Sequence, residues 1–235
     1  DSSPSRGLGD VYKRQPVTQI ANRKTTFTLT TTNGQVTAQH LISATNAYTD
    51  QAQPWLRSRL IPVISEMIAT EKLGTNRVRA LMPKLNMFGE SKQLGHYYRP
   101  SPDGERILLG GRRMHKQENF AKQRLHNGLT EIFPELEDTK IDAYWRGFVA
   151  FPFDQLPKLA VHKGIIYPSG FCGSGTVWAR WLGQKAAFMV LGEAAESAFK
   201  NLPMMTLPLY SGDPWFLPLA MSYYRLRDRF SVSTK

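Results

Sequence analysis

Three glycines, Gly170, Gly173 and Gly175, stand close together in the stretch YPSGFCGSGTVWARWLG, between an apolar strand-like run and an apolar helix-like run. Glycine accepts a positive φ and lets a ligand approach the backbone closely, and the first N–H groups of a helix attract negative charge. The turn is therefore suited to hold a phosphate or the polar edge of a ring. A tight turn that only packs the helix on the strand would also explain these glycines, so both interpretations stay open.

A second stretch, LISATNAYTDQ, has the same potential. Its apolar run ends in Ala44, Thr45 and Asn46 and then meets a short polar turn. The end of a buried strand is where an open α/β sheet usually exposes its backbone to a ligand. A plain strand end is the alternative.

The elements that would position these two stretches can be read from the spacing of apolar and turn residues. Alternation around Asn33-Gly34 predicts a β-hairpin. Pro102-Asp103-Gly104 predicts a second turn, which would pair residues 96–99 with residues 107–110. The run RLIPVISEMIATEKL reads as a strand with Pro62 at an edge or a bend. Apolar spacing predicts helices over residues 118–133 and 175–192, and the second is apolar on most sides, so we expect it to be buried.

The composition is that of a globular chain. Its 235 residues are 41% hydrophobic and include 12 Phe, 9 Tyr and 5 Trp, enough to fill a core. The formal charge of +11 comes from basic residues scattered in small groups, which indicates a solvated surface. The single cysteine, Cys172, excludes an internal disulfide and argues against a zinc or iron–sulfur site, so we expect no metal and a cytoplasmic location. No apolar run is long enough to predict a membrane span.

Residues 1–15 differ from the rest of the chain, because they combine Ser, Pro, Gly and mixed charge without a helical or strand period. We interpret them as a disordered or non-native head. Their GLGD lacks the third glycine and the flanking elements of a dinucleotide fingerprint.

The order of five stretches resembles one family. They are ISATNAYT, IATEKL, YYRPSPDGERILLGGR, YWRGFVAFPFDQLPKLA and GFCGSGTVWARWLG. Together, from Pro16 to Phe230, they resemble the FAD-dependent amine and amino-acid oxidoreductases of the D-amino-acid oxidase family, including sarcosine-oxidase-like and γ-glutamylputrescine-oxidoreductase-like members.

The resemblance implies a mixed α/β (α+β) fold. A partial Rossmann-like FAD-binding domain is expected over residues 16–58 and 151–235, and a substrate-binding domain with a mixed or antiparallel sheet over residues 59–150. Family members begin with a Gly-x-Gly-x-x-Gly unit that holds the FAD pyrophosphate. Because no such unit occurs here, we expect the sequence to be the C-terminal portion of a longer enzyme and, by itself, to bind FAD poorly.

The resemblance also implies where the flavin ring lies. Backbone N–H groups and the positive end of a helix dipole would stabilise negative charge on the flavin as it accepts a hydride. The expected cofactor-binding residues are Ala44, Thr45, Asn46, Gly170, Phe171, Cys172, Gly173, Ser174, Gly175 and Thr176.

Two departures from the family pattern bear on the chemistry. Sarcosine-oxidase-like members attach flavin through a cysteine ahead of the motif's aspartate, and WRGFVAFPFD has none, so FAD is expected to be non-covalent. The lysine that holds a substrate carboxylate in those members corresponds to Val177. This favours an amine without an α-carboxylate, unless Arg146 or Arg99 binds that group. Cys172 is interpreted as a small filler beside the flavin, with a redox role as the alternative.

The expected reaction moves a hydride from the carbon next to an amine nitrogen to the flavin. Water then hydrolyses the imine, and the electrons pass to oxygen or another acceptor. Candidates to line the pocket are Tyr98, His96 and Phe151. Each has a structural alternative, because an aromatic side chain on a strand often belongs to the core.

A rival hypothesis is a non-enzymatic basic module that binds nucleic acid or another anionic partner. It would use the tail YRLRDRF together with Arg112, Arg113, Lys116 and Arg124. Scattered charge and the lack of a nucleic-acid motif favour the enzyme. We therefore expect a small-molecule amine or amino acid as the partner and no nucleic acid.

Overall fold

The computed structural model describes residues 15–112 and 118–231. The chain forms two compact units, Asp1–Pro62 with Val149–Asp213 and Val63–Phe148 with Pro214–Lys235. The expected head, apart from Gln15, lies outside the described residues. The C-terminal segment from Pro214 groups with the second unit, whereas the sequence interpretation placed it in the FAD-binding portion.

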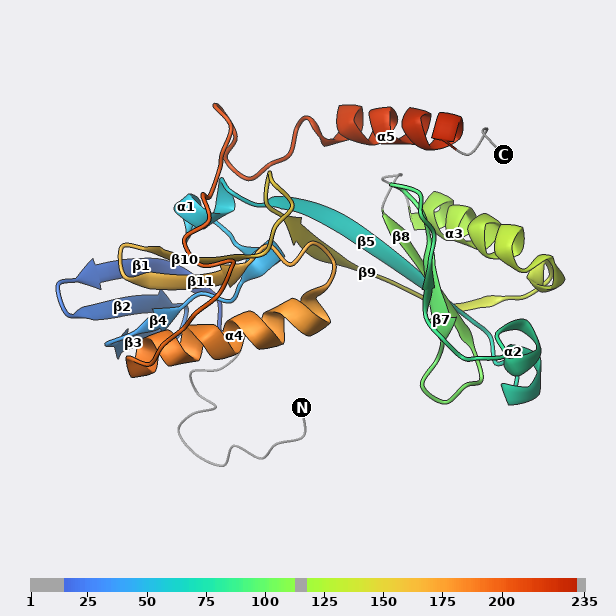
Figure 1. Ribbon diagram of the computed structural model, residues 1–235, viewed down its shortest axis with the longest axis horizontal. Coiled ribbons are helices and arrows are strands. Elements are labelled where there is room, and N and C mark those ends of the chain that lie inside the picture. Colours follow the sequence, from blue (N-terminus) through green and yellow to red (C-terminus); the bar gives the residue numbers. More distant parts are fainter. Residues whose placement is uncertain (1–14, 113–117, 232–235) are drawn as a thin grey trace. The chain divides into compact units, whose positions relative to one another are not determined.

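The first unit opens with a three-stranded antiparallel sheet (Figure 1). Its strands are β1 (Val17–Arg23), β2 (Thr26–Thr31) and β3 (Gly34–Ala38). The predicted hairpin is confirmed, because Thr31 pairs with Gly34 across the turn. Phe27 on β2 is buried in a cluster that includes residues of a second sheet.

The second sheet of this unit has the order β10-β11-β4. Its strands are β10 (Lys158–His162), β11 (Ile165–Ser169) and β4 (Leu41–Ile42). Strand β11 is antiparallel to β10 and parallel to β4. The short helices η2 (Asn46–Tyr48) and α1 (Pro54–Arg57) follow β4.

Helix α4 (Gly175–Leu191) follows β11 and ends at Gly192, whose φ of 73° forms a left-handed cap. Leu182 and Ala186 pack against Leu159 and Ile166 of the sheet, beside which the helix runs in Figure 1. The expectation that this helix is buried on most sides is wrong. Only Leu182 and Ala186 are buried, whereas Val177 and Leu191 are 63% and 68% exposed.

The second unit is built on a sheet of order β6-β7-β8-β5-β9. Its strands are β6 (Phe88–Gly89), β7 (Tyr97–Pro100), β8 (Ile107–Arg112), β5 (Ile61–Thr70) and β9 (Ile141–Phe151). Pro62 stands at the second position of β5, near the beginning of a central strand rather than in an edge strand. The helical elements are α2 (Thr75–Leu81), α3 (Glu118–Ile132), η3 (Pro134–Leu136) and α5 (Leu217–Ser231).

Helix α3 confirms the predicted amphipathic helix. Its residues Leu125 and Leu129 are fully buried and pack with Ile68 of β5 and Leu109 of β8. This face of the sheet and α3 together form the core of the second unit.

The turn predicted at Pro102-Asp103-Gly104 is also confirmed. Gly104 has a φ of 71° and donates its backbone N–H to the carbonyl oxygen of Ser101 at 2.9 Å. The strands on either side pair antiparallel, with Tyr97 opposite Gly110.

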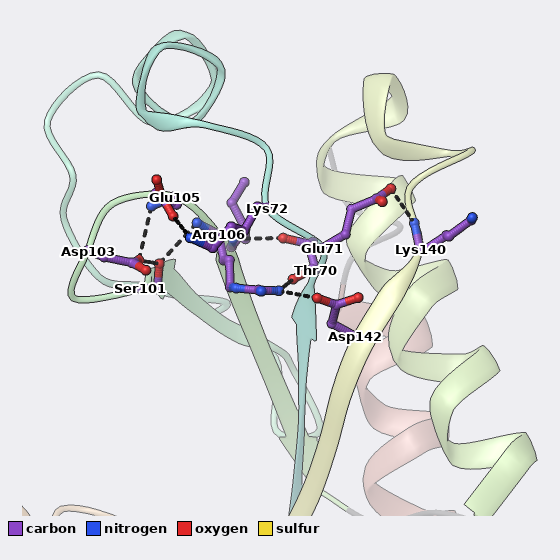
Figure 2. A network of polar contacts seen from close by, with 10 residues as sticks. Thr70, Glu71, Lys72, Ser101, Asp103, Glu105, Arg106, Lys140 and Asp142 are labelled. Carbon is purple, nitrogen blue, oxygen red and sulfur yellow. Dashed lines mark hydrogen bonds and ion pairs between the residues drawn. The ribbon is translucent and has the colours of Figure 1, made fainter.

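A polar network fixes the base of this turn (Figure 2). Arg106 donates from Nη1 to the carbonyl oxygen of Thr70 at 2.5 Å and to Oδ2 of Asp142 at 2.6 Å. Lys72 forms an ion pair with Glu105 at 2.5 Å. The turn is therefore tied to the ends of β5 and β9.

Candidate functional site

The two stretches singled out in the sequence meet at one edge of the β10-β11-β4 sheet. Leu41 and Ile42 pair in parallel with Ile165 and Ile166, and the backbone N–H of Ser43 donates to the carbonyl oxygen of Ile166 at 2.8 Å. Because β4 and β11 are parallel, their carboxyl ends lie at the same edge. This is the edge at which open α/β sheets bind ligands.

A direct hydrogen bond joins the two strand ends. The backbone N–H of Gly170 donates to Oδ1 of Asn46 at 2.9 Å. Asn46 itself has a φ of 47°. Hydroxyl contacts support the segment around it, because the side-chain oxygen of Thr45 lies 3.3 Å from that of Ser43 and 2.8 Å from that of Thr49. The adjoining Ala44 is exposed.

The glycines of the second stretch serve two different purposes. Gly170 has a φ of 71°, and a Cβ there would lie 2.3 Å from Cγ of Pro152, so packing alone excludes a side chain. Gly173 has a φ of 91° and a Cβ there would meet nothing within 4 Å. The backbone at Gly173 is thus open to close approach, while Gly170 is needed for packing.

Cys172 lies inside the turn with a φ of 52°. Its backbone N–H donates to the carbonyl oxygen of Ala150 at 3.1 Å, and its Sγ lies 3.3 Å from the carbonyl oxygen of Gly170. The neighbouring Phe171 packs against the cluster around Leu182. These contacts give Cys172 a structural place in the turn.

Helix α4 begins directly after the turn. The carbonyl oxygen of Ser174 accepts the N–H groups of Val177 and Trp178, both at 3.1 Å, and no side chain caps the helix. Gly175 and Thr176, in the first turn, precede these donors, and N–H groups at such positions have no acceptor within their helix. The partial positive charge of the helix end and these N–H groups favour a negatively polarised group beside the turn.

Phe151 closes β9 in the first unit, next to Ala150 and Pro152. Ala150 receives the hydrogen bond from Cys172, and Pro152 touches the position of Gly170. Phe151 is therefore close in sequence to two residues that contact the turn. Its role in a pocket stays a prediction.

His96 and Tyr98 lie on the face of the second sheet that packs against α3. The ring of Tyr98 contacts Phe133 edge-on with centroids 5.5 Å apart. The ring of His96 occupies the space left by two glycines, because a Cβ at Gly128 would lie 2.5 Å from its Cε1 and one at Gly111 would lie 3.3 Å from its Cδ2. Both side chains belong to the packing of the unit's interior, which is the structural alternative to a pocket role.

The surroundings of His96 favour its neutral form. Nδ1 lies 3.2 Å from Oε2 of Glu90, which also accepts the backbone N–H of His96 at 2.7 Å. Burial lowers the pKa of His96, and this effect outweighs the attraction of Glu90, while the charge of Arg124 lowers the pKa further.

A buried charged pair lies nearby and was not predicted. Glu66 of β5 is fully buried, its Oε1 accepts the hydroxyl of Tyr144 at 2.8 Å, and its Oε2 lies 3.6 Å from Nη2 of Arg124. Burial lowers the pKa of Arg124, although Glu66 acts in the opposite direction. The sequence did contain a signal, since Glu66 is the only charge in the apolar run IPVISEMIAT.

The opposite face of this sheet carries Tyr97. Its hydroxyl lies 2.5 Å from Oγ of Ser65, and its ring fills the space in front of Gly110, where a Cβ would lie 2.4 Å from Cε2 of the ring. Because side chains alternate along a strand, Tyr97 and Tyr98 point to opposite faces. The pocket role of Tyr98 stays a prediction.

The basic residues of the rival hypothesis fall into two groups in the described part of the chain. Arg124 is largely buried and donates to the carbonyl oxygen of Arg112 at 2.9 Å, and Arg112 donates to the carbonyl oxygen of Gln93 at 2.6 Å. Arg113 and Lys116 lie outside the described residues. Arg112 and Arg124 therefore serve the interior of the second unit, whereas Arg225, Arg227 and Arg229 of the tail lie exposed on α5.

Two kinds of feature are absent from residues 15–112 and 118–231. No helix there is long and apolar enough to cross a membrane. No group of three or more His, Cys, Asp or Glu side chains there could hold a metal ion.

Comparisons with known proteins identify the family of this chain. The sequence model described as "FAD dependent oxidoreductase" matches residues 5–189. Gamma-glutamylputrescine oxidoreductase of Escherichia coli (strain K12) is 32% identical over 232 residues, which are 95% of this chain and 54% of that protein. Probable oxidoreductase OrdL of Rhizobium meliloti (strain 1021) is 29% identical over 94% of this chain and 52% of its own length. The chain therefore spans about half the length of these relatives.

Two solved structures share the fold. Glycine oxidase from Geobacillus kaustophilus matches with a TM-score of 0.65 and 19% identity, over 83% of this chain and 52% of that one. L-proline dehydrogenase from P. horikoshii matches with a TM-score of 0.61 and 17% identity, over 88% of this chain and 54% of that one. The expected mixed α/β fold class is confirmed.

Proposed function

We propose a function from one premise: this chain belongs to the family of FAD-dependent oxidoreductases. The whole protein oxidises the C–N bond of an amine or amino acid, and this chain supplies the part of the enzyme that meets the flavin ring and the substrate. The printed names of the relatives support an oxidoreductase, and one of them acts on gamma-glutamylputrescine by its name.

The hydrogen bond between Asn46 and Gly170 carries the proposal. It joins the carboxyl ends of β4 and β11, beside an uncapped helix start and an open glycine backbone. This arrangement fits the edge of a ring that gains negative charge. When bound, the flavin supplies the acceptor for a hydride and two electrons. The residues that would hold it are those from Ala44 to Asn46 and from Gly170 to Thr176.

The chain's own part in the chemistry is electrostatic and positional. Backbone N–H groups at the start of α4 stabilise developing negative charge without having to reorient, because the helix fixes them. Asn46 holds the turn at Gly170 in place. No side chain of this turn offers a general base, so the amine is expected to bind in its neutral form.

Flavin binding is proposed to be non-covalent. Cys172 is the only cysteine of the sequence, and its backbone and Sγ both face carbonyl oxygens of the protein. If this thiol is structural, this sequence offers no other cysteine for a thioether link to the flavin.

The substrate is proposed to be an amine without an α-carboxylate. Val177 stands in the first turn of α4, where sarcosine-oxidase-like members resembling this chain have a lysine, and it is 63% exposed. Of the two arginines that could replace that lysine, Arg99 lines a cavity of the second unit that contains no residue of the β4 and β11 strand ends, and Arg146 interacts electrostatically with Glu118.

Flavin content and reducibility test the proposal on the full-length protein. We expect visible flavin bands, release of all flavin into the supernatant after acid precipitation, and bleaching by polyamines or secondary amines without oxygen. Neutral α-amino acids should bleach the flavin much more slowly. Flavin that stays with the precipitated protein would refute non-covalent binding, and a protein that binds flavin but is reduced only by α-amino acids would refute the amine assignment.

A further inference from the structure

The second unit contains a cavity that the proposed oxidation does not use. It has a volume of about 450 Å³, within the range of small-molecule sites. Its lining comes from α2, the segment after it and the turn between β7 and β8: Thr75, Arg79, Leu85, Met87, Arg99, Pro100, Ser101, Pro102, Asp103 and Gly104. None of these residues belongs to the β4 and β11 site.

Two arginines line the cavity without a carboxylate partner. Arg79 and Arg99 form no ion pair in the described part of the chain, and Arg99 donates only to the carbonyl oxygen of Pro100 at 3.1 Å. Neighbouring basic residues of the same unit do have acidic partners, such as Lys72 with Glu105 and Arg106 with Asp142. The charge of the two cavity arginines is therefore available to a ligand.

Asp103 is the acidic residue of the lining. Ser101 donates its hydroxyl to this carboxylate, and the backbone N–H of Glu105 donates to the same oxygen at 3.1 Å. The negative charge of Asp103 offsets one of the two arginine charges, so the lining has a net charge of +1. The network at the base of the turn, drawn in Figure 2, holds Asp103 in this arrangement.

The remaining surface of the cavity is mostly apolar. Leu85, Met87, Pro100 and Pro102 contribute hydrocarbon next to the arginines. Thr75 and Arg79 stand four residues apart on α2, so their side chains lie on one side of that helix. A ligand that matches this lining has one negative end and a short apolar chain.

We propose that this cavity binds a small aliphatic carboxylate through Arg79 and Arg99. The carboxylate oxygens accept from the two guanidinium groups, and the aliphatic chain lies against Leu85 and Met87. Valerate is the probe of choice, since n-pentanol has the same chain without the charge and inorganic phosphate has the charge without the chain.

Calorimetric titration of the full-length, flavin-loaded protein at constant ionic strength tests the proposal. Valerate should bind, and n-pentanol and phosphate should not. Arg79→Gln and Arg99→Gln should each weaken valerate binding about tenfold or more, because a charge-assisted hydrogen bond is lost. Arg77→Gln is the matched control: it removes the same charge from the same helix outside the cavity, and it should leave affinity unchanged.

Several outcomes would overturn the proposal. Wild-type protein that does not bind valerate excludes the site, and equal binding of n-pentanol or phosphate excludes a carboxylate ligand. If Arg77→Gln weakens valerate binding as much as the two cavity variants do, the effect comes from the overall charge of the protein and not from the cavity. If valerate changes the flavin absorbance and both cavity variants still bind it, the ligand sits at the flavin instead. Thermal unfolding without ligand checks each variant, and Arg79→Gln decides alone if Arg99→Gln does not fold.

Discussion

Asn46 and Gly170 are 124 positions apart, yet the side-chain oxygen of Asn46 accepts the backbone N–H of Gly170 at 2.9 Å. The bond connects the ends of two parallel strands that are paired through only two residue pairs, Leu41 with Ile165 and Ile42 with Ile166. A single amide side chain thus extends a short ladder into the proposed flavin site.

Replacing Asn46 should loosen that site. In Asn46→Ala the N–H of Gly170 loses its acceptor, which should reduce the free energy of unfolding by about 1 kcal/mol and weaken flavin binding several-fold. Fluorescence titration with FAD and urea unfolding measure the two effects. Asn22→Ala is the control, because Asn22 also bonds to the backbone in the same unit, donating to the carbonyl oxygen of Lys163, but away from the strand ends. Equal flavin affinity in both variants would contradict the role of Asn46.

Gly170 and Gly183 should respond in opposite ways to alanine. Gly170→Ala forces a Cβ to within 2.3 Å of Pro152 at a φ of 71°, so we expect loss of flavin and of soluble protein. Gly183 lies inside α4, where a Cβ would meet nothing within 4 Å, and Gly183→Ala should stabilise the helix by about 1 kcal/mol. Thermal unfolding and flavin content check both. A Gly170→Ala protein that keeps its flavin and melting temperature would show that the turn can shift.

Removing Glu66 should destabilise the second unit strongly. Glu66→Ala leaves the partly buried guanidinium of Arg124 without its carboxylate, and the cost of breaking a fully buried pair, about 3–5 kcal/mol, sets the upper end of the expected loss. Tyr144→Phe should cost only about 1 kcal/mol, since it removes one hydrogen bond. The double variant Glu66→Leu with Arg124→Met should recover most of the loss in urea unfolding. If the double variant is less stable than Glu66→Ala, the pair has a role that apolar packing does not replace.

His96 should make stability depend on pH. Its pKa is lowered in the folded state by burial, so the unfolded chain binds the proton more readily. The free energy of unfolding should therefore fall as the pH drops below the unfolded value of about 6.5, and above that value His96 should contribute no slope. The charged groups that face the ring are Glu90, Arg124 and Glu131.

Urea unfolding between pH 5 and 8 measures this effect. In His96→Gln the free energy of unfolding should change less with pH near pH 6 than in the wild type. His40→Gln, which changes an exposed histidine, should keep the pH dependence of the wild type. A slope that persists in His96→Gln would assign the pH dependence to other groups.

Local sequence signals were sufficient for much of the fold. Asn33-Gly34 and Pro102-Asp103-Gly104 place both turns, because their backbone preferences act over two or three residues. The glycine stretch and the Ala44–Asn46 strand end were likewise chosen from local chemistry, and the structure brings them to one sheet edge.

What could not be predicted depends on tertiary packing. Which of Tyr97 and Tyr98 faces α3 is a question of register, and shifting a strand by one residue exchanges its two faces. The apolar sequence of α4 suggested burial, but within the described chain only Leu182 and Ala186 of this helix are buried, while Trp181, Met189 and Val190 pack against the same cluster and stay partly exposed. The pairing of Glu66 with Arg124 joins residues 58 positions apart, and no local pattern indicates such a contact.

The division of the first unit into two chain segments has a consequence for biosynthesis. Residue 46 leaves the ribosome long before residue 170, and at about 5–20 residues per second the 124 positions between them take on the order of ten seconds. During that interval β4 has no β11 to pair with, while β5, β7 and β8, which pair with one another, are completed first. We therefore expect the second unit's sheet to form earlier during translation, and the flavin site to be among the last features of the nascent chain to assemble.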